Sequence, residues 1–414
     1  MQRLQDAIRR TLTRVRESWK RSKRERSRVE RRRQRVDEWE HFTRRGDRPP
    51  VRCTFCEATR GWLLGVWSRF LRAGLGAGRG WKRVVERVFK SSPVAEVDEG
   101  RGDSRRVFRR RSYPGSRNRR FELHVPSGYR GASAVPLLVV LHGCRQDSGD
   151  IRRISNFDAI ADREAFAVVY PYVTGYSGMR IRNCWGWWLE NEIRPGAGEV
   201  EDLWQMVEQV KAEVDVDARR IHVAGLSSGG GMAVAAMVAH RDKFASGAVV
   251  AGVPYSETPR AVAYGAPAGV VFKPTAQIVA SMKSVMGERE RPSPVLIVHS
   301  SADPVVDIQA ARNIRDSWAE CFGIDTSRPV VKSSGTTGGQ AWEHCGYRES
   351  RRRSAIETLF IEGFGHGWYG GNPGKFSFPT APNASEFMWR FFKRHPLHTE
   401  SRANGRYRQV RIAS

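Results

Sequence analysis

Residues 225–229 read Gly-Leu-Ser-Ser-Gly, the pattern G-x-S-x-G, and its central Ser227 could do covalent chemistry. A short apolar segment comes before the pattern and an alanine-rich segment follows it. A serine on such a strand-to-helix turn is exposed and strained, and flanking glycines let the backbone come close there. The context predicts a nucleophile elbow, whose chemistry is acyl transfer through an ester of Ser227.

The competing interpretation is a glycine-rich turn between a buried strand and a buried helix. A serine nucleophile needs a histidine base, a carboxylate that orients the histidine, and an oxyanion hole. On a sheet that carries a nucleophile elbow, these partners follow along the chain in the order Ser, Asp or Glu, His. The residues after the elbow therefore decide between the two interpretations.

The carboxylate is expected after a later strand. Residues 295–299 are expected to form that strand, with four apolar residues followed by His299. Asp303 is the first acidic residue beyond this run, and we predict that it is the catalytic carboxylate. Asp307 is the second choice, and it fits better as the N-cap of the next helix. A turn-forming aspartate before Pro304 is the plain alternative for Asp303.

The histidine is expected on a loop after the last strand, which residues 356–361 supply. His366 follows that strand between two glycines, so its ring can project from a flexible loop toward Ser227. We predict His366 as the general base. Three other histidines fit the order less well, because they lie in a strand, in a variable stretch and at a helix end: His299, His344 and His240.

Two backbone N–H groups are needed to hold the negative oxygen of a tetrahedral intermediate. The residue after the nucleophile, Ser228, supplies one of them. The other is expected from the loop after an early strand, where Cys144 follows Gly143. His142 lies in the same loop, and a structural hydrogen bond is the plain alternative for its role.

The elements that must position these residues alternate between β and α. Apolar runs predict strands, and helical periodicity predicts the segments between them. This alternation indicates a mostly parallel sheet with helices on both faces. The expected strands are residues 121–125, 135–141, 166–170, 221–224, 245–253, 295–299 and 356–361, and the expected helices are residues 151–165, 200–214, 231–240 and 383–393.

The first 110 of the 414 residues hold 32 basic and 14 acidic residues, which is a net charge of +18 out of +26. We therefore predict a basic, partly helical or disordered extension over 1–105, a catalytic domain over 106–396 and a basic tail over 397–414. A solvated tail is the plain interpretation of such charge. The alternative is electrostatic association with an anionic surface, and we expect no specific nucleic-acid site.

Other classes of protein are disfavoured by the sequence. It shows no transmembrane run and no secretory signal. Cys53 and Cys56 have only His41 nearby, so we expect no metal site and no cofactor. The six cysteines are too few for a disulfide scaffold, and spacing does not fix how Cys144, Cys184, Cys321 and Cys345 pair.

Taken together, the motifs resemble the poly(3-hydroxybutyrate) depolymerase family of serine esterases over residues 110–395. The segments that carry the resemblance are 136–144, 183–188, 196–199, 223–230, 301–306 and 365–371. The resemblance implies an α/β-hydrolase fold with Ser227, Asp303 and His366 as the triad. It implies short-chain hydroxyalkanoate polyesters, their oligomers or simpler esters as substrates. Related feruloyl and acetylxylan esterases share much of the pattern.

Two positions depart from the family pattern, since Gly186 replaces an asparagine and Ser300 replaces a glycine. The sequence shows no polymer-binding module, so we expect soluble oligomers, amorphous granules or small esters rather than crystalline polymer. The tryptophans of the motifs could wall the acyl pocket or pack in the core. The predicted pocket residues are His142, Trp185, Trp187 and Trp368.

The resulting hypothesis is a serine esterase that hydrolyses polyhydroxybutyrate esters or oligomers through an acyl-enzyme. One alternative is a feruloyl or acetylxylan carboxylesterase. Another is a binding protein that acts on a granule, membrane or nucleic acid through its basic extension. The family is mostly extracellular, but without an export signal the cytoplasm and a granule or membrane surface stay open as compartments.

Overall fold

The computed structural model describes residues 104–173, 182–263, 269–287, 293–348 and 354–397. The described residues all belong to one compact unit, Gly100–Ser414. The predicted basic extension and C-terminal tail fall almost wholly outside the described residues, as do Cys53 and Cys56. In the part described, no helix combines the length and apolar character needed to cross a bilayer.

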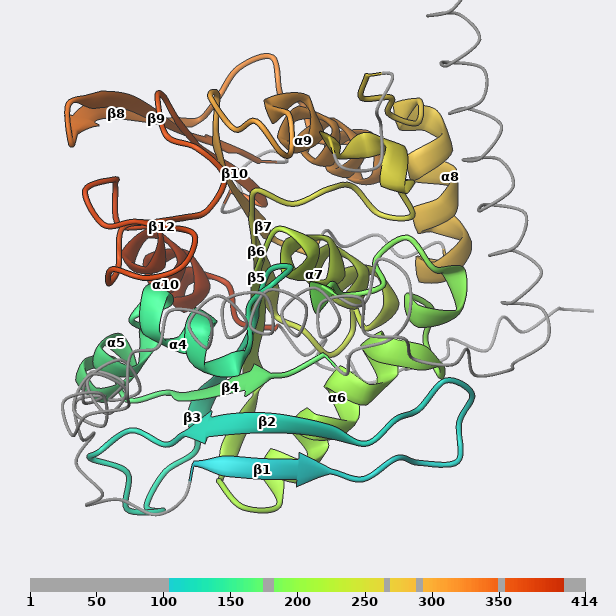
Figure 1. Ribbon diagram of the computed structural model, residues 1–414, viewed down its shortest axis with the longest axis vertical. Coiled ribbons are helices and arrows are strands. Elements are labelled where there is room, and N and C mark those ends of the chain that lie inside the picture. Colours follow the sequence, from blue (N-terminus) through green and yellow to red (C-terminus); the bar gives the residue numbers. More distant parts are fainter. Residues whose placement is uncertain (1–103, 174–181, 264–268, 288–292, 349–353, 398–414) are drawn as a thin grey trace, which may run out of the picture. The chain divides into compact units, whose positions relative to one another are not determined.

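A ten-stranded sheet forms the centre of this unit, in the order β1-β2-β4-β3-β5-β6-β7-β10-β9-β8 (Figure 1). The six strands from β4 to β10 in this order pair in parallel, and two antiparallel strands extend each end. The bounds are β1 Arg105–Phe108, β2 Arg119–His124, β3 Val135–Leu141, β4 Ala167–Pro171, β5 Val216–Leu226, β6 Ser246–Val250, β7 Val295–Ser300, β8 Val331–Thr337, β9 Gln340–Tyr347 and β10 Ile356–Ile361.

Helices cover both faces of the sheet, as the α/β pattern predicts (Figure 1). One face carries α4 Ser148–Ser155, α5 Phe157–Glu164 and α10 Ala384–Arg394, and the other carries α6 Gly198–Lys211, α7 Ser228–Ala239, α8 Thr275–Met286 and α9 Ile308–Phe322. Two single-turn 3₁₀ helices, Glu190–Glu192 and Pro259–Ala261, and the short pair β11 Trp368–Tyr369 and β12 Ser377–Phe378 lie in the loops.

Strand β3 shows how the sheet holds two cores. All seven of its residues are buried. Leu137 and Val139 pack toward the α6–α9 layer, whereas Leu138 and Val140 pack toward the α4, α5 and α10 layer. Side chains alternate between the faces of a strand, so a central strand covered on both sides is apolar throughout. The sheet is therefore a rigid platform, and its strand ends carry the site.

The structure corrects one expected element and adds a hairpin that the sequence did not predict. Residues 151–165 were expected to form one helix, but they form parts of α4 and α5, because Asn156 takes a left-handed conformation with φ 56° between them. The hairpin of β8 and β9 was not predicted. Strand β8 is mostly exposed and polar, so it lacks the apolar pattern that marks a strand.

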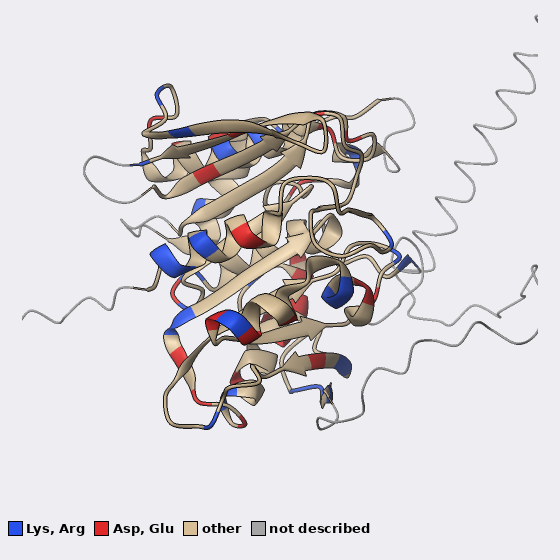
Figure 2. Ribbon diagram, turned by 90° about the vertical axis from the view of Figure 1, so that its left-hand side faces the viewer, with Lys and Arg blue, Asp and Glu red and all other residues tan. Residues whose placement is uncertain are grey.

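Charged residues of both signs are interspersed over the helices and loops of the described unit, and the inner strands are largely uncharged (Figure 2). Some of this charge is buried. Arg119 lies in the interior, with its Nε 2.7 Å from Asp202 Oδ2 and its Nη2 3.7 Å from Glu199 Oε1. This buried group ties β2 to the start of α6, next to the loop that carries the tryptophan motif.

Candidate active site

Ser227 lies between the end of β5 and the start of α7, as predicted, with φ 56° and ψ −117°. Non-glycine residues held at such positive φ cost about 1–3 kcal/mol. The neighbouring glycines make the turn feasible, because a Cβ at Gly225 would lie 2.2 Å from the Gly229 carbonyl oxygen. A Cβ at Gly229 would lie 2.4 Å from the oxygen of Leu141. The turn is a nucleophile elbow in its geometry.

The structure brings together the three residues that the chain order selected. His366 Nε2 lies 2.8 Å from Ser227 Oγ, and His366 Nδ1 lies 2.7 Å from Asp303 Oδ2. The second carboxylate oxygen of Asp303 accepts the N–H groups of Val305 and Val306, at 2.8 and 3.0 Å. Asp303 is therefore fixed from one side by backbone donors and presents its other oxygen to the imidazole.

The carboxyl group of Asp303 is shielded from solvent but stays ionised. Burial raises its pKa, and the hydrogen bond and charge of His366, with contributions from His299 and the Val306 N–H, outweigh this and hold the pKa below the ordinary value. His299 lies behind Asp303 and donates from Nε2 to the Val306 carbonyl oxygen at 2.8 Å. Burial lowers the pKa of His299, which favours its neutral form.

Asp307, the second choice for the carboxylate, is the N-cap of α9 instead. Its Oδ1 accepts the N–H of Gln309 at 2.7 Å. Because one oxygen caps the helix and the residue is exposed, its position matches the plain role that the sequence suggested.

The loop after β3 places a second backbone donor beside the serine. Gln146 Oε1 accepts the N–H of Gly143 at 2.8 Å, and its amide nitrogen donates to the Lys375 carbonyl at 2.9 Å. Within the described residues, no acceptor occupies the N–H of Cys144. Ser228 begins α7, where the first N–H groups have no partner inside the helix. The two predicted oxyanion donors therefore have no acceptor among the described residues.

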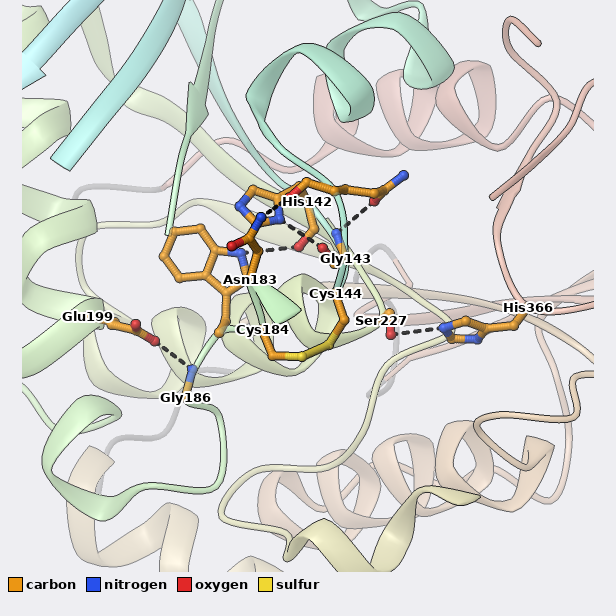
Figure 3. The surroundings of a disulfide bond; sticks show 11 residues. His142, Gly143, Cys144, Asn183, Cys184, Gly186, Glu199, Ser227 and His366 are labelled. Atoms are coloured by element: carbon orange, nitrogen blue, oxygen red, sulfur yellow. Dashed lines mark hydrogen bonds between the residues drawn. A yellow bond between two sulfur atoms is a disulfide. The ribbon is translucent and has the colours of Figure 1, made fainter. Parts of the chain in front are cut away.

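A disulfide joins Cys144 to Cys184, and it lies beside Ser227 (Figure 3). It connects the loop after β3, residues 142–146, to the loop of residues 183–188. We call residues 142–146 the oxyanion loop, because the predicted donor Cys144 lies in it. Cys321 and Cys345, the other pair that the sequence left open, are both free. The bond restrains Cys144, whose N–H is one of the two predicted oxyanion donors.

The loop after Cys184 is held by a buried carboxylate. Glu199 accepts the N–H of Gly186 at 2.6 Å (Figure 3). Asn183 donates to the Gln146 carbonyl at 3.3 Å, which links the same loop to the oxyanion loop. Sequence reasoning noted Glu199 only as part of a motif and missed Gln146. Neither residue type marks such a role, since each acts through a contact that only the fold creates.

A cavity of about 390 Å³ opens above Ser227. Its walls are mostly apolar, and Trp187 and Trp188 meet edge to face with ring centroids 5.2 Å apart. The described residues that line the cavity are Gly143, Cys144, Arg145, Arg182, Cys184, Trp187, Trp188, Leu226, Ser227, Ser228, Val253, Val262, Val305, Val306, His366 and Phe376. Trp188 is one of the motif tryptophans that could wall the pocket, and the two arginines were not predicted.

Three of the four predicted pocket residues do not line this cavity. Trp185 is fully buried and donates from Nε1 to the His142 carbonyl at 3.1 Å. Trp368 is buried in the other core and donates to Ser385 Oγ at 3.1 Å. Trp185 and Trp187 are two residues apart on an irregular loop, and Trp187 lines the cavity whereas Trp185 is enclosed in the core.

His142, the remaining member of the predicted pocket, shapes the oxyanion loop. Its Nδ1 donates to the Gly143 carbonyl at 2.8 Å, and its Nε2 accepts the N–H of Val173 at 3.2 Å. Burial lowers the pKa of His142 to about 4, which keeps the ring neutral and the tautomer fixed by these two partners. The structural alternative for this histidine is the one that the structure shows.

A parallel sheet covered on both faces, with an elbow serine after β5, defines an α/β hydrolase. The family model described as "Esterase PHB depolymerase" matches residues 120–328, half of the chain, and the chain belongs to that family. It is 32% identical over 246 residues to poly(3-hydroxyalkanoate) depolymerase C of Paucimonas lemoignei, covering 59% of this chain and 57% of that protein. The chain thus spans little more than half the length of this relative.

Two further matches are to proteins named as esterases, one by sequence and one by structure. Feruloyl esterase B of Neurospora crassa is 26% identical over 288 residues, which cover 66% of this chain and 88% of that protein. The solved structure of an acetyl xylan esterase from Aspergillus awamori superimposes with a TM-score of 0.50 at 20% identity, over 60% of this chain and 89% of that one. The predicted α/β-hydrolase fold is confirmed.

Proposed function

We propose that this protein is a serine carboxylesterase that hydrolyses short-chain hydroxyalkanoate esters and their oligomers. The observation that carries the proposal is the continuous contact from Asp303 through His366 to Ser227, at the floor of an apolar cavity. Its membership of the esterase family supports the reaction class, and the name of the bacterial depolymerase that it resembles supports the substrate class.

In the proposed mechanism, Ser227 Oγ attacks the ester carbonyl carbon while its proton passes to His366 Nε2. The N–H groups of Ser228 and Cys144 hold the negative oxygen of the tetrahedral intermediate. The carbon–oxygen bond to the alcohol then breaks, and His366 gives the alcohol its proton. Water attacks the acyl-enzyme with His366 again as base, which releases the carboxylic acid and restores the serine hydroxyl.

Asp303 acts through the histidine in this scheme. Its Oδ2 accepts the Nδ1 proton of His366, so Nε2 is left free to accept the proton of Ser227. The carboxylate also stabilises the imidazolium that forms during attack. Its lowered pKa keeps it ionised across the neutral range, where the neutral imidazole must work as a base.

A feruloyl or acetylxylan esterase is the second candidate. It is supported by the coverage of feruloyl esterase B, 88% of whose length aligns with this chain. The paired tryptophan rings in the cavity offer flat surfaces for an aromatic acyl group. An electrostatic role for residues 1–105 on an anionic surface is a separate proposal, supported by sequence charge alone.

A panel of esters tests the assignment. We expect the protein to hydrolyse p-nitrophenyl butyrate and the linear dimer and trimer of 3-hydroxybutyrate, and to hydrolyse methyl ferulate and acetylated xylan more slowly. The comparison uses kcat/KM for each ester, because this ratio reports discrimination between substrates. A higher kcat/KM on methyl ferulate or acetylated xylan would move the assignment to the second candidate, and no hydrolysis of any ester would overturn both.

Breaking the disulfide is expected to weaken both stability and turnover. The half-cystines are 40 residues apart. Cys184→Ser removes the cross-link that closes a loop of this size, and we expect the free energy of unfolding to fall by about 4 kcal/mol. We also expect kcat on p-nitrophenyl butyrate to fall by up to roughly 10²-fold, the cost of one displaced oxyanion donor.

Cys321→Ser is the matched control, since Cys321 is free and only partly buried. Urea unfolding gives the stability of each variant, and initial rates under conditions where the fold is intact give kcat. If Cys184→Ser kept the kcat of the unaltered enzyme, the restraint on Cys144 would have no part in catalysis.

A further inference from the structure

Two arginines, Arg145 and Arg182, line a cavity whose walls are otherwise mostly apolar. They line it together with eight apolar or aromatic side chains, and no Asp or Glu is among the described lining residues. Both arginines are exposed residues, and both lie in the lining of the cavity. The hydrolysis of a neutral ester gives no reason for positive charge at this place.

The backbone holds the two arginines together. The N–H of Arg145 donates to the carbonyl oxygen of Arg182, and Lys375 Nζ donates to the carbonyl oxygen of Arg145. Arg145 also directly follows Cys144, and Cys184 lies two residues after Arg182, so the disulfide closes the same pair of loops (Figure 3). The arginine pair, Arg145 and Arg182, is therefore fixed beside the oxyanion loop, and Lys375 adds a third positive charge.

The conformation of Arg145 is an independent sign of constraint. Its φ is 63°, in the left-handed region where glycine is unstrained and a long side chain is uncommon. Arg145 therefore holds a less favoured backbone conformation in a loop that lines the cavity.

We propose that the arginine pair binds a carboxylate of the substrate, which lies a few bonds from the scissile ester. This inference rests on the proposed function and narrows its substrate to anionic esters of hydroxy acids. A guanidinium group matches the geometry of a carboxylate and binds it through charge-assisted hydrogen bonds. In an oligomer of hydroxy acids, the free carboxylate lies on the alcohol side of the last ester bond.

This recognition fixes where an oligomer is cut. With its terminal carboxylate on the arginine pair and the neighbouring ester carbonyl at Ser227, the last bond of the chain is hydrolysed. One hydroxy acid leaves as the alcohol product, and the shortened acyl chain occupies the apolar walls. The enzyme then releases monomers from the carboxylate end, and an ester bond inside a long polymer is a poor substrate.

A pair of matched esters measures this preference. 3-Butyryloxybutanoate carries the carboxylate on the alcohol side, and sec-butyl butyrate has nearly the same shape without it. Acid release in a pH-stat gives kcat/KM for both, and monobutyl succinate adds an arm with the carboxylate on the acyl side. We expect the alcohol-side anion to be preferred over the neutral ester, and the preference to shrink as salt is added.

Arg145→Gln is expected to reduce the anionic-to-neutral ratio of kcat/KM on the order of 10- to 100-fold, the value of a hydrogen-bonded charge. Arg145→Lys keeps the charge and is expected to retain part of the ratio. Arg130→Gln is the matched control, because Arg130 is exposed and donates only to carbonyl groups of its own loop, Ser127 and Tyr129. The control is expected to leave the ratio unchanged.

Three outcomes are separable. An equal rate on the anionic and neutral esters, or a ratio that neither Arg145→Gln nor Arg182→Gln changes, would overturn carboxylate recognition while esterase activity stands. A preference for monobutyl succinate over 3-butyryloxybutanoate would overturn cleavage from the carboxylate end. Failure of the enzyme to hydrolyse any of the three esters, and p-nitrophenyl butyrate as well, would overturn the proposed function itself.

Discussion

Ser227→Ala is expected to lower kcat for p-nitrophenyl butyrate on the order of 10⁶-fold, because the acyl-enzyme cannot form without its oxygen. The substitution removes one hydroxyl from the cavity floor and leaves His366 and Asp303 in contact with each other. KM is expected to change little, since the cavity walls stay in place. Release of p-nitrophenol at high enzyme concentration measures the residual rate.

Ser281→Ala is the matched control for this experiment. Ser281 lies on the exposed side of α8 and donates to the carbonyl oxygen of Gln277 within the same helix. Its replacement is expected to leave kcat and KM as they are. Turnover by Ser227→Ala at the rate of the unaltered enzyme, once contaminating esterase is excluded, would show that another residue is the nucleophile.

Asp303→Asn is expected to lower kcat on the order of 10⁴-fold while the fold is kept. The asparagine oxygen can still accept the N–H groups of Val305 and Val306, so its amide nitrogen faces His366. That nitrogen is a donor, and it forces the Nδ1 atom of His366 to act as an acceptor. The proton then lies on Nε2, which can no longer receive the proton of Ser227.

Asp307→Asn separates the two candidate carboxylates. Asparagine caps helices about as well as aspartate, so the start of α9 is expected to be unaffected and kcat to stay near that of the unaltered enzyme. Circular dichroism checks the fold of both variants, and initial rates give kcat. A large loss in Asp307→Asn with little in Asp303→Asn would reverse the assignment.

The parallel core of the fold could be predicted, because a strand that is buried on both faces appears in the sequence as a continuous apolar run. The bounds of β3 and β10 match the apolar runs at residues 135–141 and 356–361. Strand β8 could not be predicted, because its residues are polar and it is held by backbone pairing with β9 at the sheet edge. The break at Asn156 was missed because a left-handed residue leaves the apolar periodicity of the surrounding segment intact.

The candidate site also contains some residues that could be predicted from the sequence and others that could not. Ser227, Asp303 and His366 could be found because the order of the triad follows from the order of the strands. The cavity walls could not be predicted to the same degree. Trp185 and Trp187 are two residues apart in one motif, yet one is enclosed and the other faces the cavity. The direction of each tryptophan side chain depends on an irregular loop, which is held by Glu199 and the disulfide.

The positive φ of Ser227 sets activity against robustness in this protein. A glycine at that position would relieve the strain of the turn, yet it would remove the oxygen that we propose as the nucleophile. Selection for heat resistance alone, in a library that varies the elbow, is therefore expected to enrich chains that are more durable and inert. Thermostabilised versions of this protein have to be sought with turnover as the first criterion and melting temperature as the second.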